Sequence, residues 1–167
     1  MARRSGIYIV PTNRWYIERT VWLIAGVVLI VATTLAAFVQ KYFALLIIAT
    51  GAASVTVALT GFCVVGNILR LFGVKPMLPQ PLRKDDGKRR IFYFMQTDRW
   101  YLERYIYIFV GVNLSLSSML ARFSSQGWLF FTGFVGTATI VFSFTGFCIM
   151  ANLLYRLGAE PRLCRYI

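Results

Sequence analysis

The sequence contains no histidine. This removes the usual axial ligand of haem and chlorophyll, the commonest zinc and copper ligand, and the commonest proton shuttle. Acidic residues are also few, six against 18 lysines and arginines. None falls inside a long apolar run, so a carboxylate-driven ion pump is not expected. We therefore predict no cofactor and no His-ligated haem, chlorophyll or metal; bound lipids or pigments would be held through apolar contacts only.

Cysteine is scarce as well. Three cysteines are too few and too scattered for a disulfide scaffold. Cys63 and Cys148 fall inside apolar runs, where cysteine most often acts as a small hydrophobic residue. The sequence also shows no Gly-rich phosphate loop and no paired carboxylates, and its serines have no base to activate them. These absences predict that the protein is not an enzyme.

Apolar residues dominate what is present. They make up 58% of the 167 residues, aromatic residues make up 16%, and the mean hydropathy is +0.65. Such a composition is typical of a membrane protein and too apolar for a soluble domain of this length. The net charge of +12 comes from basic residues that flank the apolar runs. Because they form no stripe on a soluble surface, we expect no nucleic-acid partner.

The chain is a tandem duplication with an offset of 85 residues. Residues 12–19 return as residues 97–104, and residues 60–63 return as residues 145–148. Over residues 8–82 against 93–167, 24 of 75 pairs are identical without a gap. Chance agreement at one fixed offset would give only a handful of identities, so an internal repeat is the simplest explanation.

Uncharged stretches predict an all-α integral membrane protein with four transmembrane helices, arranged as two tandem helical hairpins in parallel repeat. The first repeat comprises residues 1–82 with spans at about 21–39 and 42–69; a basic cytoplasmic linker comprises 83–92; the second repeat comprises 93–167 with spans at about 105–121 and 127–154. About 20 residues cross a bilayer core, so the second stretch of each repeat exceeds one crossing. The capping residues Thr12 and Asn13 after Pro11 predict a short interfacial lead-in helix before the first span.

The positions of lysine and arginine predict the orientation. Of the 18, only Lys41 and Arg122 lie at the expected hairpin tips. By the positive-inside rule the termini and the linker are cytoplasmic and both tips point outward, in a bacterial inner membrane. Each repeat has an even number of spans, so both enter the membrane in the same sense, and a pseudo-twofold axis along the membrane normal should relate them.

Residues that agree between the copies gather at one depth. Counting about 20 residues inward from the tips places them at the inner leaflet. We call the charged and amide residues at this depth the polar layer: Arg14, Glu18, Arg19, Asn67, Arg99, Glu103, Arg104 and Asn152. Interfacial aromatic rings are expected at the same level: Trp15, Tyr16, Trp22, Trp100 and Tyr101. The spacing of Thr60, Cys63 and Asn67 would place them along one helical face.

Three interpretations of the polar layer stay open. It is a structural clasp that locks each hairpin at its inner end, with Cys63 as filler. Alternatively, Cys63 and Cys148 are candidate reactive thiols, with Arg19 and Arg104 lowering their pKa or holding an anionic adduct. In the third, the basic and aromatic residues dock lipid headgroups or a partner.

The second span of each repeat has its own character. Small residues suited to close helix contact inside the bundle occur in both: Ala49, Gly51, Ala53, Ser54, Gly133, Gly136, Thr137 and Ala138. Phenylalanines make the last span bulky enough to face lipid or another subunit: Phe130, Phe131, Phe134, Phe142, Phe144 and Phe147.

The half-repeat resembles a known family. An Arg-bearing lead-in, a hairpin, Thr-Gly-Phe-Cys and a Leu-x-x-x-Gly close, as in Leu69–Gly73 and Leu154–Gly158, are similar to the small bacterial inner-membrane two-helix family of unknown function typified by the membrane domain of the inner-membrane rhodanese. That family usually has Cys-Pro where this chain has Cys63-Val64 and Cys148-Ile149. The resemblance implies that single hairpins pair as dimers and that this chain is such a dimer fused into one polypeptide. It also implies a link to sulfur transfer.

Two functions follow from these observations. The first is a non-catalytic accessory or scaffolding subunit of a larger bacterial membrane complex, with respiratory or photosynthetic electron transfer as candidates; its partners are other integral membrane subunits and anionic phospholipid headgroups. The alternative is a thiol or persulfide carrier at the cytoplasmic face that uses Cys63 and Cys148.

Overall fold

The computed structural model describes residues 6–78 and 92–163. The expected linker at 83–92 lies outside the described residues except for its last position. The helices are α1 (Ile17–Phe38), the short 3-10 helix η1 (Lys41–Phe43), α2 (Ala44–Thr60), α3 (Val64–Leu71), α4 (Leu102–Phe123), α5 (Trp128–Thr145) and α6 (Ile149–Arg156). Extended structure in the described ranges is limited to two isolated β-bridges.

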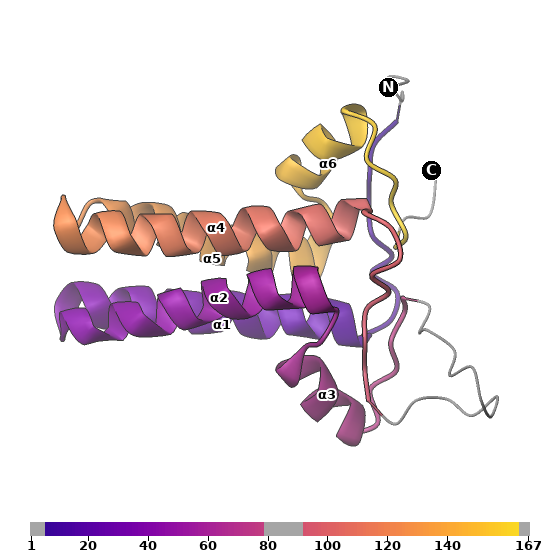
Figure 1. Cartoon of the computed structure of the whole chain (residues 1–167), viewed down its shortest axis with the longest axis horizontal. Coiled ribbons are helices and arrows are strands. Elements are labelled where there is room, and N and C mark those ends of the chain that lie inside the picture. The colour runs from indigo at the N-terminus through magenta and orange to yellow at the C-terminus, as the bar shows by residue number, and fades with distance from the viewer. Residues whose placement is uncertain (1–5, 79–91, 164–167) are drawn as a thin grey trace.

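Four of these helices are long and apolar enough to cross a membrane. Including η1, they span 22, 20, 22 and 18 residues. They run alongside one another as a bundle, with α3 and α6 at one end (Figure 1). The expected all-α integral membrane fold with four spans is confirmed.

The expected second span of each repeat is divided into two helices, which corrects the spans 42–69 and 127–154. The helix ends at Gly61 and at Gly146, which take left-handed φ angles of 76° and 71°. Because glycine has no Cβ, it adopts this conformation without strain and commonly closes a helix. Thr60, Cys63 and Asn67 therefore do not share one continuous helical face.

The expected lead-in helices are also absent from the described chain. In the first repeat no helix precedes Ile17 among residues 6–16, and in the second none precedes Leu102 among residues 92–101. These segments are extended because the opposite repeat satisfies their backbone groups. The N–H of Val10 donates to the carbonyl of Gly146 at 3.0 Å, and that of Met95 to Gly61 at 2.8 Å. Capping residues favour a helix locally, but the cross-repeat bonds decide the conformation.

The main helix contacts join the repeats: α1 packs on α5, and α2 on α4. Glycines meet at both crossings. A Cβ on Gly26 would lie 2.8 Å from the carbonyl oxygen of Gly136, and one on Gly111 would lie 2.6 Å from that of Gly51. Close backbone approach between membrane helices requires small residues at such points. The contacts are reciprocal, as a twofold relation between the repeats requires.

Only some of the expected packing residues lie at these crossings. Gly51 and Gly136 are buried, whereas Ala49, Ala53, Thr137 and Ala138 are exposed. Of the phenylalanines expected on the outside, Phe142 is buried instead, with its ring 4.4 Å from the Trp22 ring.

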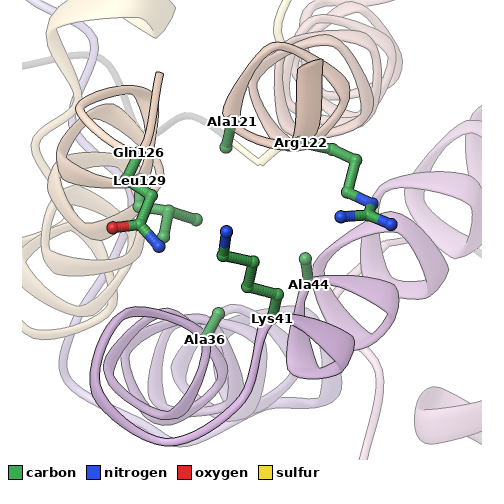
Figure 2. Close-up of a pocket in the computed structure, with 7 residues that line it drawn as sticks. All are labelled: Ala36, Lys41, Ala44, Ala121, Arg122, Gln126 and Leu129. Atoms are coloured by element: carbon green, nitrogen blue, oxygen red, sulfur yellow. The ribbon is translucent and has the colours of Figure 1, made fainter. Parts of the chain in front are cut away.

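Both hairpin tips lie at the end of the bundle opposite α3 and α6. Lys41 and Arg122 line one small cavity there (Figure 2). The Lys41 side chain reaches into the space between the helices, whereas Arg122 extends outward (Figure 2). The cavity volume is about 20 Å³, enough for a single water molecule. The parallel arrangement of the two repeats is confirmed by this shared end.

Candidate functional site: the polar layer

Glu18 is a buried acceptor at the start of α1. Its carboxylate accepts the backbone N–H groups of Met77 and Leu78 at 3.0 and 3.1 Å. It also accepts the hydroxyl of Tyr93 at 3.0 Å. The backbone donors belong to the tail of its own repeat, and the tyrosine belongs to the other repeat. Hydrogen bonds of this number and kind satisfy a buried carboxylate.

Glu103 repeats the arrangement in the second copy. It accepts the backbone N–H of Leu163 at 2.8 Å and that of Arg162 at 3.1 Å. The hydroxyl of Tyr8, from the first repeat, donates to it at 3.0 Å. Each carboxylate therefore holds the closing turn of its own repeat to the lead-in of the other.

The buried arginines bind backbone carbonyls and not the neighbouring glutamates. Arg19 donates through Nε to the carbonyl of Ser143 on α5, and through Nη1 to that of Thr12 at 2.7 Å. Arg104 donates through Nε to the carbonyl of Ala58 on α2 at 2.8 Å. The carbonyls of Ser143 and Ala58 lie in the last turns of α5 and α2, where helix acceptors lack partners within the helix. The clasp predicted within each hairpin thus joins the two hairpins instead.

Arg14 and Arg99 contribute differently from the other members of the polar layer. Both side chains are exposed. Their backbone carbonyls accept Nη1 of Arg19 at 3.1 Å and Nη1 of Arg104 at 3.0 Å. The guanidinium groups of Arg14 and Arg99 are therefore left at the surface of the molecule.

The two asparagines attach the short helices to the opposite lead-in. Asn67 on α3 accepts the N–H of Tyr93 at 2.7 Å and donates to its carbonyl at 3.1 Å. Asn152 on α6 does the same with Tyr8, at 2.7 and 3.0 Å. In both cases the side-chain amide bonds the backbone N–H and the backbone carbonyl of one residue, as a neighbouring strand does in a β-sheet.

The expected interfacial aromatics separate into two groups. Trp15 and Trp100 are about half exposed, and each lies under a guanidinium, with Arg19 4.0 Å and Arg104 4.1 Å from the ring centres. This geometry is a cation–π contact. The remaining three, Tyr16, Trp22 and Tyr101, are buried and belong to the core. These three rings are enclosed by protein and are not open to lipid headgroups as expected; Trp22 packs on Tyr107 and Phe142 of the other repeat.

Two pseudo-equivalent hydroxyls in this core have no hydrogen-bond partner in the part of the chain that the structure describes. They belong to Tyr16 and Tyr101, which are 5% and 2% exposed. Burial raises the pKa of both phenols. An unpaired buried hydroxyl costs free energy, so these residues stabilise the core through their rings, and the Tyr101 ring also lies 4.4 Å from the Arg162 guanidinium.

Cys63 is a capping residue in the structure. Its Sγ accepts the N–H of Gly66 at 3.2 Å at the start of α3. The side chain is buried, and burial raises the pKa of the thiol. Cys148 starts α6 without such a bond and is partly exposed. Since Arg19 and Arg104 are turned toward carbonyl groups, the expected thiolate activation finds no support at Cys63.

Sequence reasoning missed the tyrosines that complete the layer. Tyr8 and Tyr93 are fully buried donors to Glu103 and Glu18. They form one of the identical pairs between the copies, and that identity was the available signal. The second repeat has an addition of its own, because Arg162 pairs with Asp98 at 3.2 Å and lowers the pKa of that carboxyl.

Comparison with known proteins agrees with the architecture. Residues 101–162 match the family model "Inner membrane protein YgaP-like, transmembrane domain". No curated protein and no solved structure matches the chain. The matched region begins at Tyr101, just before α4, and ends at Arg162, so it contains the whole second hairpin with α6 and three residues of the polar layer, Glu103, Arg104 and Asn152. The family resemblance predicted from the half-repeat is thereby confirmed: the second repeat is similar to the transmembrane domain of YgaP-like inner membrane proteins.

Proposed function

We propose that this protein is a non-catalytic accessory subunit that packs against other integral subunits of a larger bacterial inner-membrane complex. The observation that carries the proposal is the difference between two outward faces at equivalent positions. Phe130, Phe134 and Phe144 on α5 are 84%, 65% and 54% exposed. At the same positions α2 has Leu45, Ala49 and Leu59. Internal packing does not require this difference, since both faces point away from the bundle.

The polar layer supports a structural role for the inner end. Glu18, Glu103, Arg19 and Arg104 are buried and are engaged with backbone groups and tyrosines. Groups already bonded in this way hold the two repeats in register. The surface available for binding other subunits is then the lipid-facing one, and aromatic side chains are the usual anchors at such interfaces.

Gentle-detergent purification tests the proposal. We expect a tagged chain to co-purify with a larger membrane complex, and visible absorbance of that complex would identify an electron-transfer assembly. Phe130→Ala with Phe134→Ala should release the complex, whereas the matched changes Leu45→Ala and Ala49→Gly on α2 should retain it. A lone monodisperse protomer from the parent chain, under conditions that preserve known complexes, would contradict the proposal.

The orientation is part of the same proposal. With the positive-inside rule, the polar layer and the termini face the cytoplasm and the Lys41 and Arg122 tips face outward. The thiol or persulfide carrier stays a prediction of the sequence, which the buried Cys63 thiol does not favour. Growth with Cys63→Ser and Cys148→Ser separates the two functions, because an accessory subunit does not need either thiol.

A further inference from the structure

The short helices α3 and α6 carry apolar side chains on their outward sides. On α3, Val64, Ile68 and Leu71 are 61%, 47% and 82% exposed. Their spacing of four and three residues places them along one face of the helix. The equivalents on α6 are Ile149 and Leu153, continued by Leu157. Each short helix therefore has an apolar stripe that the rest of the described residues, 6–78 and 92–163, does not cover.

The opposite side of each short helix is fixed to the protein. A Cβ on Gly66 would lie 2.7 Å from the ring of Tyr93, and Asn67 holds the backbone of the same tyrosine. On α6, Ala151 and Leu154 are buried. With one side held in this way, the apolar stripes cannot turn toward the bundle.

The place of these helices in the fold limits what can cover the stripes. Both leave the bundle at the polar-layer end and lean outward on opposite sides, steeply inclined to the four long helices (Figure 1). The membrane-spanning helices begin or end at that level, at Ile17, Thr60, Leu102 and Thr145. A helix with an apolar side at this depth lies at the boundary between hydrocarbon and headgroups.

The charge of the same end points to one kind of surface. Arg14, Lys75, Arg99 and Arg156 have exposed side chains there. Cationic side chains next to an apolar helix face are complementary to a leaflet that contains anionic phospholipid. The apolar stripes and the cations Arg14 and Arg99 occur at equivalent positions on opposite sides of the bundle, whereas Lys75 corresponds to Glu160 and Arg156 to Leu71.

We propose that α3 and α6 are interfacial anchors: their apolar stripes insert into one leaflet, and the neighbouring cations bind the phosphates of anionic phospholipids. This deepens the lipid contact of the proposed function by naming the surface and the lipid class. It does not depend on a partner complex, so the two proposals fail separately. Two anchors on opposite sides would hold the bundle upright and fix its depth in the leaflet.

Nitroxide labels test the insertion in vesicles of phosphatidylcholine and phosphatidylglycerol. Labels at Ile68→Cys and Leu153→Cys, with the native cysteines replaced by serine, should be more accessible to oxygen than to a water-soluble nickel chelate. They should resemble a label at the exposed α1 residue Val27, whereas one at Asn13 should show the reverse. Chelate accessibility at Ile68 and Leu153, or shielding from both reagents, would overturn the proposal.

Spin-labelled lipids test the recognition of charge. The parent chain should enrich phosphatidylglycerol over phosphatidylcholine in its lipid shell, and the enrichment should fall as salt is added. Lys75→Gln with Arg156→Gln should lower it about twofold or more, whereas Lys75→Arg with Arg156→Lys should preserve it. Equal enrichment in the Gln pair and the parent chain would overturn the assignment of these cations.

Discussion

Tyr93 of the second repeat donates its hydroxyl to Glu18 of the first repeat at 3.0 Å, and Tyr8 of the first donates to Glu103 of the second at the same distance. Each repeat thus supplies the group that completes the other's buried carboxylate. This exchange explains why the identities between the copies gather at one end of the bundle. There the glutamates, the buried arginines and the asparagines of each copy bond equivalent partners in the other repeat, so both copies need the same residues.

Removal of a donated hydroxyl should destabilise the protein. Tyr93→Phe leaves Glu18 buried with one acceptor position unpaired, and we expect a loss of about 1–3 kcal/mol in the free energy of unfolding. Tyr8→Phe should have the same effect through Glu103. Denaturant titration in detergent micelles measures the change.

Tyr16→Phe and Tyr101→Phe are the matched controls, because their buried hydroxyls have no partner among the described residues. Their unfolding free energies should stay within about 0.5 kcal/mol of the parent chain or rise slightly. A Tyr16→Phe loss as large as that of Tyr93→Phe would contradict the assigned hydrogen bonds.

The glycines at the helix crossings should tolerate no side chain. Gly26→Ala and Gly111→Ala each place a methyl group within 2.8 Å of a backbone oxygen on the facing helix. We expect a loss of about 1–3 kcal/mol for each, because the helices must move apart. Gly133→Ala on α5 is the control, since a Cβ there would lie 3.7 Å from the nearest side-chain atom, Cγ2 of Thr33. Its thermal unfolding midpoint should be the same as that of the parent chain. Equal midpoints for Gly111→Ala and Gly133→Ala would show that the crossings are not tight.

The two cysteines should differ in reactivity although their positions are equivalent. Cys63 is 6% exposed and its thiol pKa is raised by burial, whereas Cys148 is partly exposed. With Cys164→Ser in both cases, a chain that keeps only Cys148 should react with maleimide at pH 7.4 at least tenfold faster than one that keeps only Cys63. Faster labelling at Cys63 than at Cys148 would contradict this prediction and would favour the thiol or persulfide carrier function.

Alkaline pH should destabilise the fold. Burial raises the pKa of Cys63 above its ordinary value of 9.0, and burial together with Glu18 raises that of Tyr93 well above 10.0. The folded state therefore favours the protonated groups, so their contribution is complete below those ordinary values. It is lost as the pH rises through the folded-state pKa values.

Unfolding temperatures between pH 7 and 11 measure this loss. A chain with Cys63→Ala and Tyr93→Phe should lose less stability between pH 9 and 11 than the parent chain. Parallel curves for the two chains would assign the alkaline loss to other groups.

The sequence predicts the large features well because they depend on local composition. The lengths of the uncharged stretches predict four membrane spans, and the 85-residue offset predicts two equivalent repeats. The breaks at Gly61 and Gly146 were not predicted, since the uncharged run continues through both glycines. Their cause is a contact with the opposite lead-in, 34 residues away from Gly61 at Met95 and 136 away from Gly146 at Val10. Trp22 was expected at the headgroups because its ring suits that region as well as a core; its partners Tyr107 and Phe142 come from the other repeat.

The polar layer shows the same limit in its chemistry. Glu18 beside Arg19 suggests an ion pair, and a pairing between sequence neighbours is the simplest expectation. In the structure each side chain instead bonds a different partner from a distant segment. The identity of Tyr8 with Tyr93 was visible in the alignment of the two copies, but its role requires the three-dimensional pairing.

Association of the separated repeats tests the central claim most directly, that two equivalent hairpins interlock through reciprocal bonds. Residues 1–82 and 83–167 would be produced as two chains in one cell, each with its own tag, and purified through the first tag. We predict recovery of both chains in equal amounts, and a clear loss of the second when Glu18→Ala and Glu103→Ala are introduced together. Recovery of the first chain alone, or equal recovery with and without the two glutamates, would contradict the account.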